Sequence, residues 1–220
     1  MKILAVIFDL DGVIVSTDEY HYQAWKQISD QENINFDRKI NERLRGVSRM
    51  ESLEIILSHS DKNYSENEKS QLAQRKNEIY CELLNKLSPN DILPGVISLL
   101  LGLIARNIKV AIGSSSKNTP FILDQIGLAK NFDAIADGNS IKSSKPDPEV
   151  FLLAAKMLGV KPEECAVIED AKAGIDAAKT AGMMAVGVGS AANCVNADMK
   201  LNDLTELDIE QLLEVTKIRS

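Results

Sequence analysis

Short apolar segments alternate with amphipathic helical segments through much of this chain, and this alternation limits the fold more than any other feature. A short, continuous run rich in Val and Ile is typical of a strand that is buried on both faces. Such strands, alternating with helices, predict a doubly wound parallel sheet with right-handed crossovers, which is an α/β fold. Strands are expected at residues 3–8, 108–112, 132–136, 166–168 and 184–188.

A helical stretch interrupts this pattern after the first strand. Residues 17–90 show no strand-like alternation, and their apolar residues recur at helical spacing. Trp25 is expected inside this stretch and His59 at its surface. The sequence therefore predicts an α/β core in two pieces, residues 1–15 and 93–220, with a helical cap inserted at 16–92. Helices within the cap are expected at 19–31, 37–44, 51–59 and 65–87.

Composition excludes several classes of protein. The 220 residues are 45% hydrophobic and 26% charged, as in ordinary globular domains, and the net charge of -7 argues against non-specific nucleic-acid binding. The three cysteines, Cys81, Cys165 and Cys194, have no zinc or disulfide spacing, which favours a reducing compartment. With no signal peptide or membrane span predicted, we expect a cytoplasmic monomer that binds neither nucleic acid nor membrane.

Two acids directly follow the first predicted strand. Asp9 and Asp11 come at the point where open α/β sheets bind ligands, and Gly12 allows a sharp turn there. Carboxylates this close repel one another unless they share a cation or a proton. The pair therefore predicts a divalent metal, a division of roles, or both. An EF-hand calcium loop is excluded, because its fifth and twelfth positions are Val13 and Tyr20.

Further polar side chains follow the other predicted strands. They are Ser114, Ser116, Lys117 and Asn118, then Lys145, then Glu169 and Asp170. Each group alone is also typical of an ordinary turn or loop, but the ends of parallel strands all lie on one edge of the sheet. Carboxylates there suit Mg²⁺, while hydroxyls, lysines and backbone N–H groups suit a phosphoryl group. Together they indicate phosphoryl transfer, in which one Asp attacks phosphorus and the other moves a proton.

These motifs resemble those of the haloacid dehalogenase-like superfamily over essentially the whole chain. The matching segments are Asp9-Leu-Asp-Gly-Val, Gly113-Ser-Ser-Ser-Lys-Asn, Lys145-Pro-Asp-Pro-Glu-Val-Phe and Glu169-Asp-Ala-Lys-Ala-Gly-Ile. The resemblance implies that Asp9 is the nucleophile and Asp11 the general acid/base. It also implies that Mg²⁺ is held by the Asp9 carboxylate, the Asp11 carbonyl and Asp170, with Glu169 close by. Ser114 and Lys145 would hold the transferring phosphoryl group.

The inserted stretch resembles the caps of the β-phosphoglucomutase group within this superfamily, at residues 17–25, 45–52 and 75–77. A mutase must bind a second phosphate at the far end of its sugar, and Arg49 offers a bidentate contact to it. The resemblance implies further roles. Ser116, Lys117 and Asn118 would complete the second phosphate site, Gly46, Val47, Ser52 and Lys76 would contact the sugar, and Thr17 and His21 would link cap closure to proton transfer at Asp11.

The resemblance implies a reaction that interconverts β-D-glucose 1-phosphate and D-glucose 6-phosphate through an aspartyl-phosphate enzyme and β-glucose 1,6-bisphosphate. The sequence itself leaves open which hexose phosphate is preferred. A sugar-phosphate phosphatase of the same fold is the first alternative, and a non-catalytic protein that binds phosphate or metal is the second. Three positions depart from the usual superfamily pattern, which leaves the hydrogen bonding around the site and at the cap hinge open. They are Ser16, Ser115 and Ala171.

Overall fold

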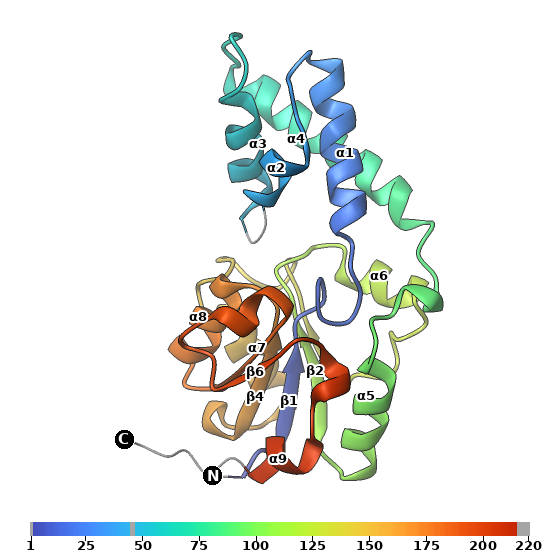
Figure 1. Cartoon of the computed structure of the whole chain (residues 1–220), viewed down its shortest axis with the longest axis vertical. Coiled ribbons are helices and arrows are strands. Elements are labelled where there is room, and N and C mark those ends of the chain that lie inside the picture. The colour runs from blue at the N-terminus through green and yellow to red at the C-terminus, as the bar shows by residue number, and fades with distance from the viewer. Residues whose placement is uncertain (1, 45–46, 215–220) are drawn as a thin grey trace. The chain divides into compact units, whose positions relative to one another are not determined.

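The chain divides into two compact units (Figure 1). The computed structural model describes residues 2–44 and 47–214. The α/β unit contains the residues up to Ser16 and those from Ser88 onward, and the helical unit contains Thr17–Leu87. The architecture is therefore an α/β unit interrupted after its first strand by a helical insertion.

The second boundary lies before residue 92, where the sequence predicted the cap to end. Residues 88–92 belong to the α/β unit because the end of this segment and the residue after it pair with the backbone that follows the first strand. The Leu93 N–H donates to the Ile14 carbonyl at 2.9 Å, and Ile92 forms an antiparallel bridge with Val15. The two segments through which the chain leaves and re-enters the α/β unit thus lie side by side.

Six parallel strands form the sheet in the described residues, in the order β3-β2-β1-β4-β5-β6. The strand order reverses at β1, which pairs with both β2 and β4, and such switch points are where α/β sheets bind ligands. This confirms the predicted fold class. The strands are β1 (Ala5–Phe8), β2 (Lys109–Gly113), β3 (Ala134–Ala136), β4 (Cys165–Glu169), β5 (Met184–Val188) and β6 (Met199–Leu201).

Both faces of the sheet are covered. Ala5 and Ile7 of β1 belong to an apolar cluster with α7 (Glu149–Leu158) and α8 (Lys172–Thr180). Successive strand residues point to opposite faces, and Val6 and Phe8 are fully buried as well. Burial on both faces is why β1 is a continuous apolar run in the sequence. The remaining helices of this unit are α5 (Val96–Ala105), which packs on β2, α6 (Thr119–Gln125), and α9 (Ile209–Glu214), which packs on α5.

The edge strand β6 was not predicted from the sequence. It is three residues long, and its central residue Lys200 is exposed, so it offers neither an apolar run nor a clear alternation. The α7 helix begins at Glu149, with the Asp147 carboxylate accepting the Glu149 N–H at 2.9 Å. Short 3₁₀ turns lie at Pro89–Asp91, Pro162–Glu164, Gly189–Asn193 and Leu204–Glu206.

The helical unit consists, in its described part, of α1 (Asp18–Gln31), α2 (Arg38–Glu42), α3 (Arg49–Leu57) and α4 (Glu66–Leu84). α1 packs on α4, and an apolar cluster that contains Trp25 and Leu53 forms its interior. Trp25 is buried and His59 exposed, as predicted. α3 begins earlier than the predicted residue 51, because Ser48 and Glu51 form a capping box.

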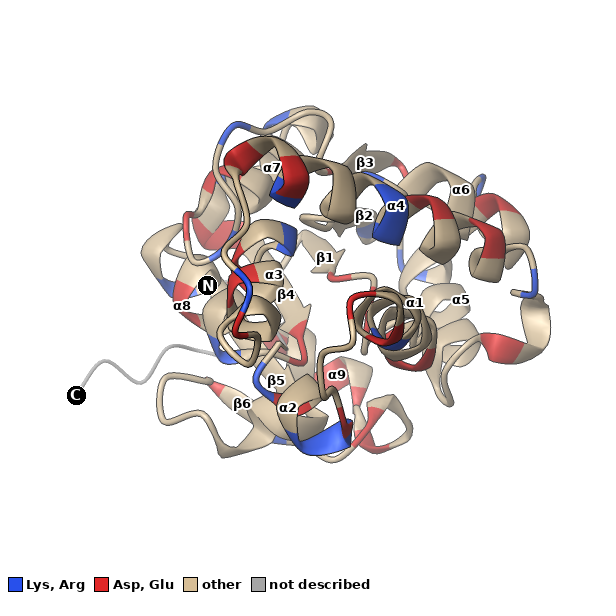
Figure 2. Ribbon diagram, turned by 90° about the horizontal axis from the view of Figure 1, so that it is seen from above, with Lys and Arg blue, Asp and Glu red and all other residues tan. Residues whose placement is uncertain are grey.

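Charged residues of both signs are scattered along the elements of each unit (Figure 2). Against a net charge of -7, any anionic ligand must rely on cations placed locally within its site. None of the described helices combines the length and apolar character that a membrane crossing requires.

Candidate active site

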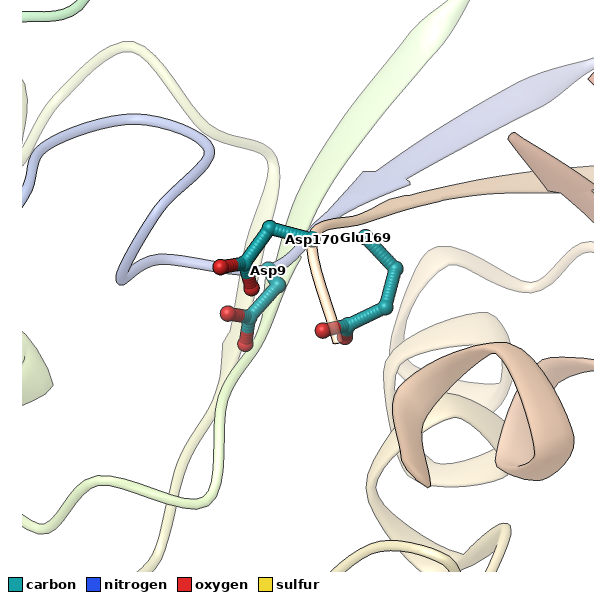
Figure 3. Close-up of side chains that lie close together, drawn as sticks. All are labelled: Asp9, Glu169 and Asp170. Atoms are coloured by element: carbon teal, nitrogen blue, oxygen red, sulfur yellow. The ribbon is translucent and has the colours of Figure 1, made fainter. Parts of the chain in front are cut away.

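Three carboxyl groups converge at the ends of β1 and β4 (Figure 3). Phe8 pairs with Ile168 in the sheet, and the Asp9 N–H donates to the Ile168 carbonyl at 2.9 Å. This pairing places Asp9 beside Glu169 and Asp170, and one carboxylate oxygen from each lies within 4.8 Å of the others. The structure thus brings together acids that are far apart in the sequence.

Lys145 connects two of these acids. Its Nζ lies 2.5 Å from Asp9 Oδ1 and 2.8 Å from Glu169 Oε2. Asp9 and Glu169 are 7% and 1% exposed, so these contacts are shielded from water. Burial alone would lower the pKa of Lys145, but the two neighbouring carboxylates outweigh burial and raise its pKa. Lys145 is therefore a permanent cation.

Glu169 differs from an ordinary surface acid. Burial and the nearby Asp9 carboxylate raise the pKa of Glu169 to about 7, while Lys145 opposes that shift. Its other oxygen accepts the Ala171 N–H at 3.0 Å. The carboxyl group is thus oriented by hydrogen bonds. It lies in a cluster that contains more carboxyl groups than lysines.

A divalent metal ion fits this cluster. Asp9, Glu169 and Asp170 are hard oxygen donors of the kind that Mg²⁺ prefers. Lys145 contacts two of the three carboxylates, so a second cation beside them would reduce the remaining repulsion. The donor set therefore agrees with the metal that the sequence predicts.

Gly12 makes room for Asp170. Its φ of +82° lies in the region that favours glycine, and a Cβ atom there would come within 2.2 Å of Asp170 Oδ2. Any larger residue would be strained and would displace this carboxylate. The position of the Asp170 carboxylate therefore requires a glycine at residue 12.

The loop after β2 is held in a fixed conformation by hydrogen bonds. Ser114 is buried, and its hydroxyl oxygen accepts the Ser116 N–H at 3.1 Å. The Ser116 hydroxyl oxygen in turn accepts the Asn118 N–H at 3.2 Å. Lys117, by contrast, is exposed. The backbone nitrogen of Lys145 lies 3.5 Å from the Ser115 hydroxyl oxygen, so this loop also contacts the segment that carries the lysine of the acid cluster.

The other candidate residues lie in the helical unit, where Lys76 contacts His21. Lys76 Nζ lies 2.7 Å from His21 Nδ1. An ammonium group can only donate, so we assign Nδ1 as the acceptor and the ring proton to Nε2. Burial, together with the positive charges of Lys76 and Arg49, holds the pKa of His21 well below its usual value. His21 is therefore a neutral imidazole at pH 7.

The residues expected at the sugar and at the second phosphate also lie on this unit. Arg49 is exposed at the first position of α3, and its Nη2 donates to Asn77 Oδ1 at 2.8 Å. Ser52 is buried and Val47 is exposed. Gly46 lies outside the described residues. Thr17 is buried and accepts a hydrogen bond from the hydroxyl of Tyr80.

Comparison with known proteins adds to this geometry. Residues 3–182 match the family described as haloacid dehalogenase-like hydrolase. The chain belongs to this family. The match covers the segments that carry Asp9, Lys145 and Asp170, so the family assignment and the acid cluster rest on the same part of the molecule.

Individual relatives cover almost the whole chain. The β-phosphoglucomutase of Bacillus subtilis is 50% identical over 212 residues, which are 96% of this chain and 94% of the relative. A crystal structure of β-phosphoglucomutase from Clostridium difficile has a TM-score of 0.87 at 46% identity, covering 96% of this chain and 95% of that one. A phosphorylated carbohydrates phosphatase of Thermotoga maritima is 31% identical over 217 residues, covering 97% of this chain and 98% of the relative.

Sequence reasoning missed two residues that support the site of this haloacid dehalogenase-like protein. Tyr80 follows Lys76 by one helical turn, so spacing alone could have placed both on one face of α4. Asp137 is buried after β3, where it accepts the Asn139 N–H at 3.0 Å, and the Asn139 amide donates to the Lys117 carbonyl at 2.9 Å. An Asp-Gly pair at a strand end is a turn signal that could have indicated this support.

Proposed function

We propose that this chain is a β-phosphoglucomutase that interconverts β-D-glucose 1-phosphate and D-glucose 6-phosphate. The observation that carries the proposal is the 50% identity to the Bacillus subtilis enzyme of that name, which extends over 96% of this chain. The likeness therefore includes the helical unit, whose residues are expected to distinguish a mutase from a phosphatase of the same fold.

The proposed reaction begins with a phosphoryl group on Asp9. The 6-hydroxyl of β-glucose 1-phosphate attacks phosphorus, the bond between phosphorus and the Asp9 oxygen breaks, and the hydroxyl proton passes to Asp11. The products of this step are β-glucose 1,6-bisphosphate and a free Asp9 carboxylate. After the bisphosphate reverses its orientation, Asp9 attacks the 1-phosphate and Asp11 returns the proton to O1. Glucose 6-phosphate leaves, and phospho-Asp9 is regenerated.

Residues of the α/β unit would stabilise the charge that this transfer develops. Lys145 is a permanent cation beside Asp9, and the buried Ser114 hydroxyl belongs to the loop after β2. Both are suited to the oxygens of a phosphoryl group. Mg²⁺ held by Asp9, the Asp11 carbonyl and Asp170, with Glu169 beside them, would supply Lewis-acid neutralisation of the phosphoryl oxygens.

Recognition of the rest of the substrate is assigned to the other predicted residues. Arg49 would contact the second phosphate, together with Ser116, Lys117 and Asn118. Sugar hydroxyls would be contacted by Ser52 and Lys76, with the backbone at Gly46 and Val47 close to the ring. Thr17 and His21 would support proton transfer at Asp11. The bisphosphate requires two anion sites, whereas hydrolysis of a monophosphate requires one.

A phosphatase is the competing function, because the relatives include a phosphorylated carbohydrates phosphatase at 31% identity. Both reactions would pass through phospho-Asp9, and they differ in whether a sugar hydroxyl or water attacks it. Exclusion of water from phospho-Asp9 is therefore the property that defines the mutase. Cytoplasmic location and a monomeric state stay predictions from the sequence.

The deciding experiment incubates the protein with β-glucose 1-phosphate, Mg²⁺ and a trace of β-glucose 1,6-bisphosphate. Glucose 6-phosphate and inorganic phosphate are measured in the same sample, with α-glucose 1-phosphate as the control substrate. The proposal expects glucose 6-phosphate from the β-anomer alone, with little phosphate released. Phosphate release without isomerisation would identify a phosphatase instead.

A further inference from the structure

Tyr80 contacts three of the residues that the proposed reaction uses in the helical unit. It lies on α4 and is 2% exposed. Its hydroxyl donates to Thr17 Oγ1 at 2.9 Å, and its ring stacks on the His21 imidazole with centroids 4.1 Å apart and an interplanar angle of 25°. Lys76 Nζ lies 4.5 Å from the centre of the same ring.

These contacts follow from the packing of two helices. Thr17 and His21 are four residues apart at the start of α1, so their side chains lie on one face of that helix. Lys76 and Tyr80 have the same spacing on α4, which packs against α1. Two pairs of side chains therefore interlock across one helix–helix interface.

Each contact fixes a different property of its partner. The Tyr80 hydroxyl donates to Thr17, so the Thr17 hydroxyl retains its own hydrogen for donation to another acceptor. Ring stacking fixes the plane of the His21 imidazole, and with it the direction of Nδ1 toward Lys76. The Tyr80 ring face also attracts the Lys76 ammonium group.

We propose that Tyr80 is a positioning residue for phosphoryl transfer, whose hydroxyl orients the Thr17 hydroxyl without touching the substrate. The inference rests on the proposed function, because that function gives Thr17 and His21 their role in proton transfer at Asp11. Tyr80 acts through its hydroxyl, so a ring of the same shape without the hydroxyl is a sufficient test.

Tyr64 provides a matched control within the same unit. It is half-buried, it packs against the apolar cluster of the helical unit, and its hydroxyl donates to Glu32 Oε2 at 3.2 Å. Removing either hydroxyl thus deletes a hydrogen bond of the helical unit. Only Tyr80 has a partner in the proposed proton-transfer machinery.

The experiment compares four variants with the wild type: Tyr80→Phe, Tyr64→Phe, Thr17→Val and the double variant of Tyr80→Phe with Thr17→Val. For each we would measure kcat and KM for β-glucose 1-phosphate, together with the thermal midpoint. Tyr80→Phe is expected to lower kcat by about tenfold, the effect of losing one oriented hydrogen bond, with little change in KM. Tyr64→Phe is expected to leave kcat and KM unchanged.

The double variant separates positioning from general packing. If Tyr80 acts through Thr17, the double variant is as slow as Thr17→Val alone, because the second change removes a contact that no longer exists. The proposal is overturned if the two losses multiply, or if Tyr80→Phe lowers kcat no more than Tyr64→Phe does. A raised KM with an unchanged kcat would also overturn it, since this is the signature of lost ground-state binding.

Failure of the proposed function would be visible separately, in the wild-type protein. If the wild type releases phosphate instead of forming glucose 6-phosphate, the mutase assignment is wrong. The same five proteins, compared by phosphate release, would then still test Tyr80, because hydrolysis of phospho-Asp9 also requires proton transfer near Asp11.

Discussion

Lys145 in the α/β unit and Lys76 in the helical unit are both withdrawn from solvent, yet they have different neighbours. Lys145 forms ion pairs with two carboxylates, at 2.5 and 2.8 Å. Lys76 is 2% exposed and contacts the imidazole of His21 and the faces of two aromatic rings. Carboxylates thus stabilise the Lys145 ammonium group by ion pairing, whereas the imidazole and the ring faces stabilise that of Lys76 by hydrogen bonding and cation–π attraction.

This difference indicates how the work is divided between the two units. In the α/β unit Lys145 offsets part of the negative charge of the acid cluster, and a divalent metal would offset more of it. The helical unit carries the exposed guanidinium of Arg49, which suits recognition of an anionic sugar phosphate. The comparison therefore predicts that changes at Asp9 or Lys145 abolish all chemistry, while a change at Arg49 alters substrate choice.

The largest effect is expected from Asp9→Asn. Without its carboxylate nucleophile the protein should lose isomerisation and ester hydrolysis together, each by at least about 10⁴-fold. The measurement is the rate of glucose 6-phosphate formation, with hydroxylamine-sensitive phosphorylation of the protein as a second readout. Asp124→Asn changes an exposed aspartate of the same unit, so as the control it should leave both rates unchanged. Retained phosphorylation of the Asp9 variant would contradict the nucleophile assignment.

A smaller and selective effect is expected from Arg49→Ala. Loss of the second phosphate contact should reduce isomerisation by about 10²-fold, while hydrolysis of a small phosphate ester changes little. Both rates would be measured on the same preparation. Arg38→Ala removes another exposed arginine of the helical unit and should leave both rates intact. Equal losses in the two assays would count against a role at the distal phosphate.

The two lysines are expected to differ in their effect on stability. Lys145→Met leaves the Asp9 and Glu169 carboxylates uncompensated, and in EDTA it should lower the free energy of unfolding by about 3 kcal/mol. Lys76→Met places an unbranched apolar chain against aromatic rings and should cost about 1 kcal/mol. Urea unfolding curves would give both values. Added Mg²⁺ should restore part of the stability that Lys145→Met loses. Equal losses in the two variants would contradict the proposed difference between the two lysines.

The smallest effect concerns the protonation of His21. Its folded-state pKa lies below the 6.5 of an unperturbed histidine, so the folded protein resists a proton that the unfolded chain accepts. The resulting stability is present above pH 6.5 and declines as the pH falls below that value. An NMR titration should find the His21 ring neutral at pH 6.5, with the exposed His59 as an internal reference. A half-protonated His21 ring at that pH would contradict the assignment.

The fold could be predicted because apolar strands alternate with helices, and the acid cluster could be predicted because parallel strands end at one edge. Asp9 and Asp170 follow two such strands and lie close together in the structure. That Lys145 lies between Asp9 and Glu169 could not be predicted, because this depends on the conformation of the long loop that follows β3. Its position is a property of tertiary structure alone.

The contacts of Tyr80 could not be predicted either. Spacing places it on the same face as Lys76, but sequence alone does not say which face of α4 meets α1. The residue at which the helical unit ends could not be predicted from the sequence either. The sequence shows prolines and a glycine near residues 89–95, whereas the boundary depends on a backbone pairing between Val15 and Ile92.

That pairing has a consequence for how such proteins diversify. The segments before and after the helical unit pair with each other at Val15 and Ile92, within the α/β unit. The helical unit is therefore an insertion at a single point of the α/β unit. Such an insertion can be exchanged or lengthened without altering the strand register of the sheet. New substrates could thus be acquired by recombination at this junction while the phosphoryl-transfer apparatus is inherited intact.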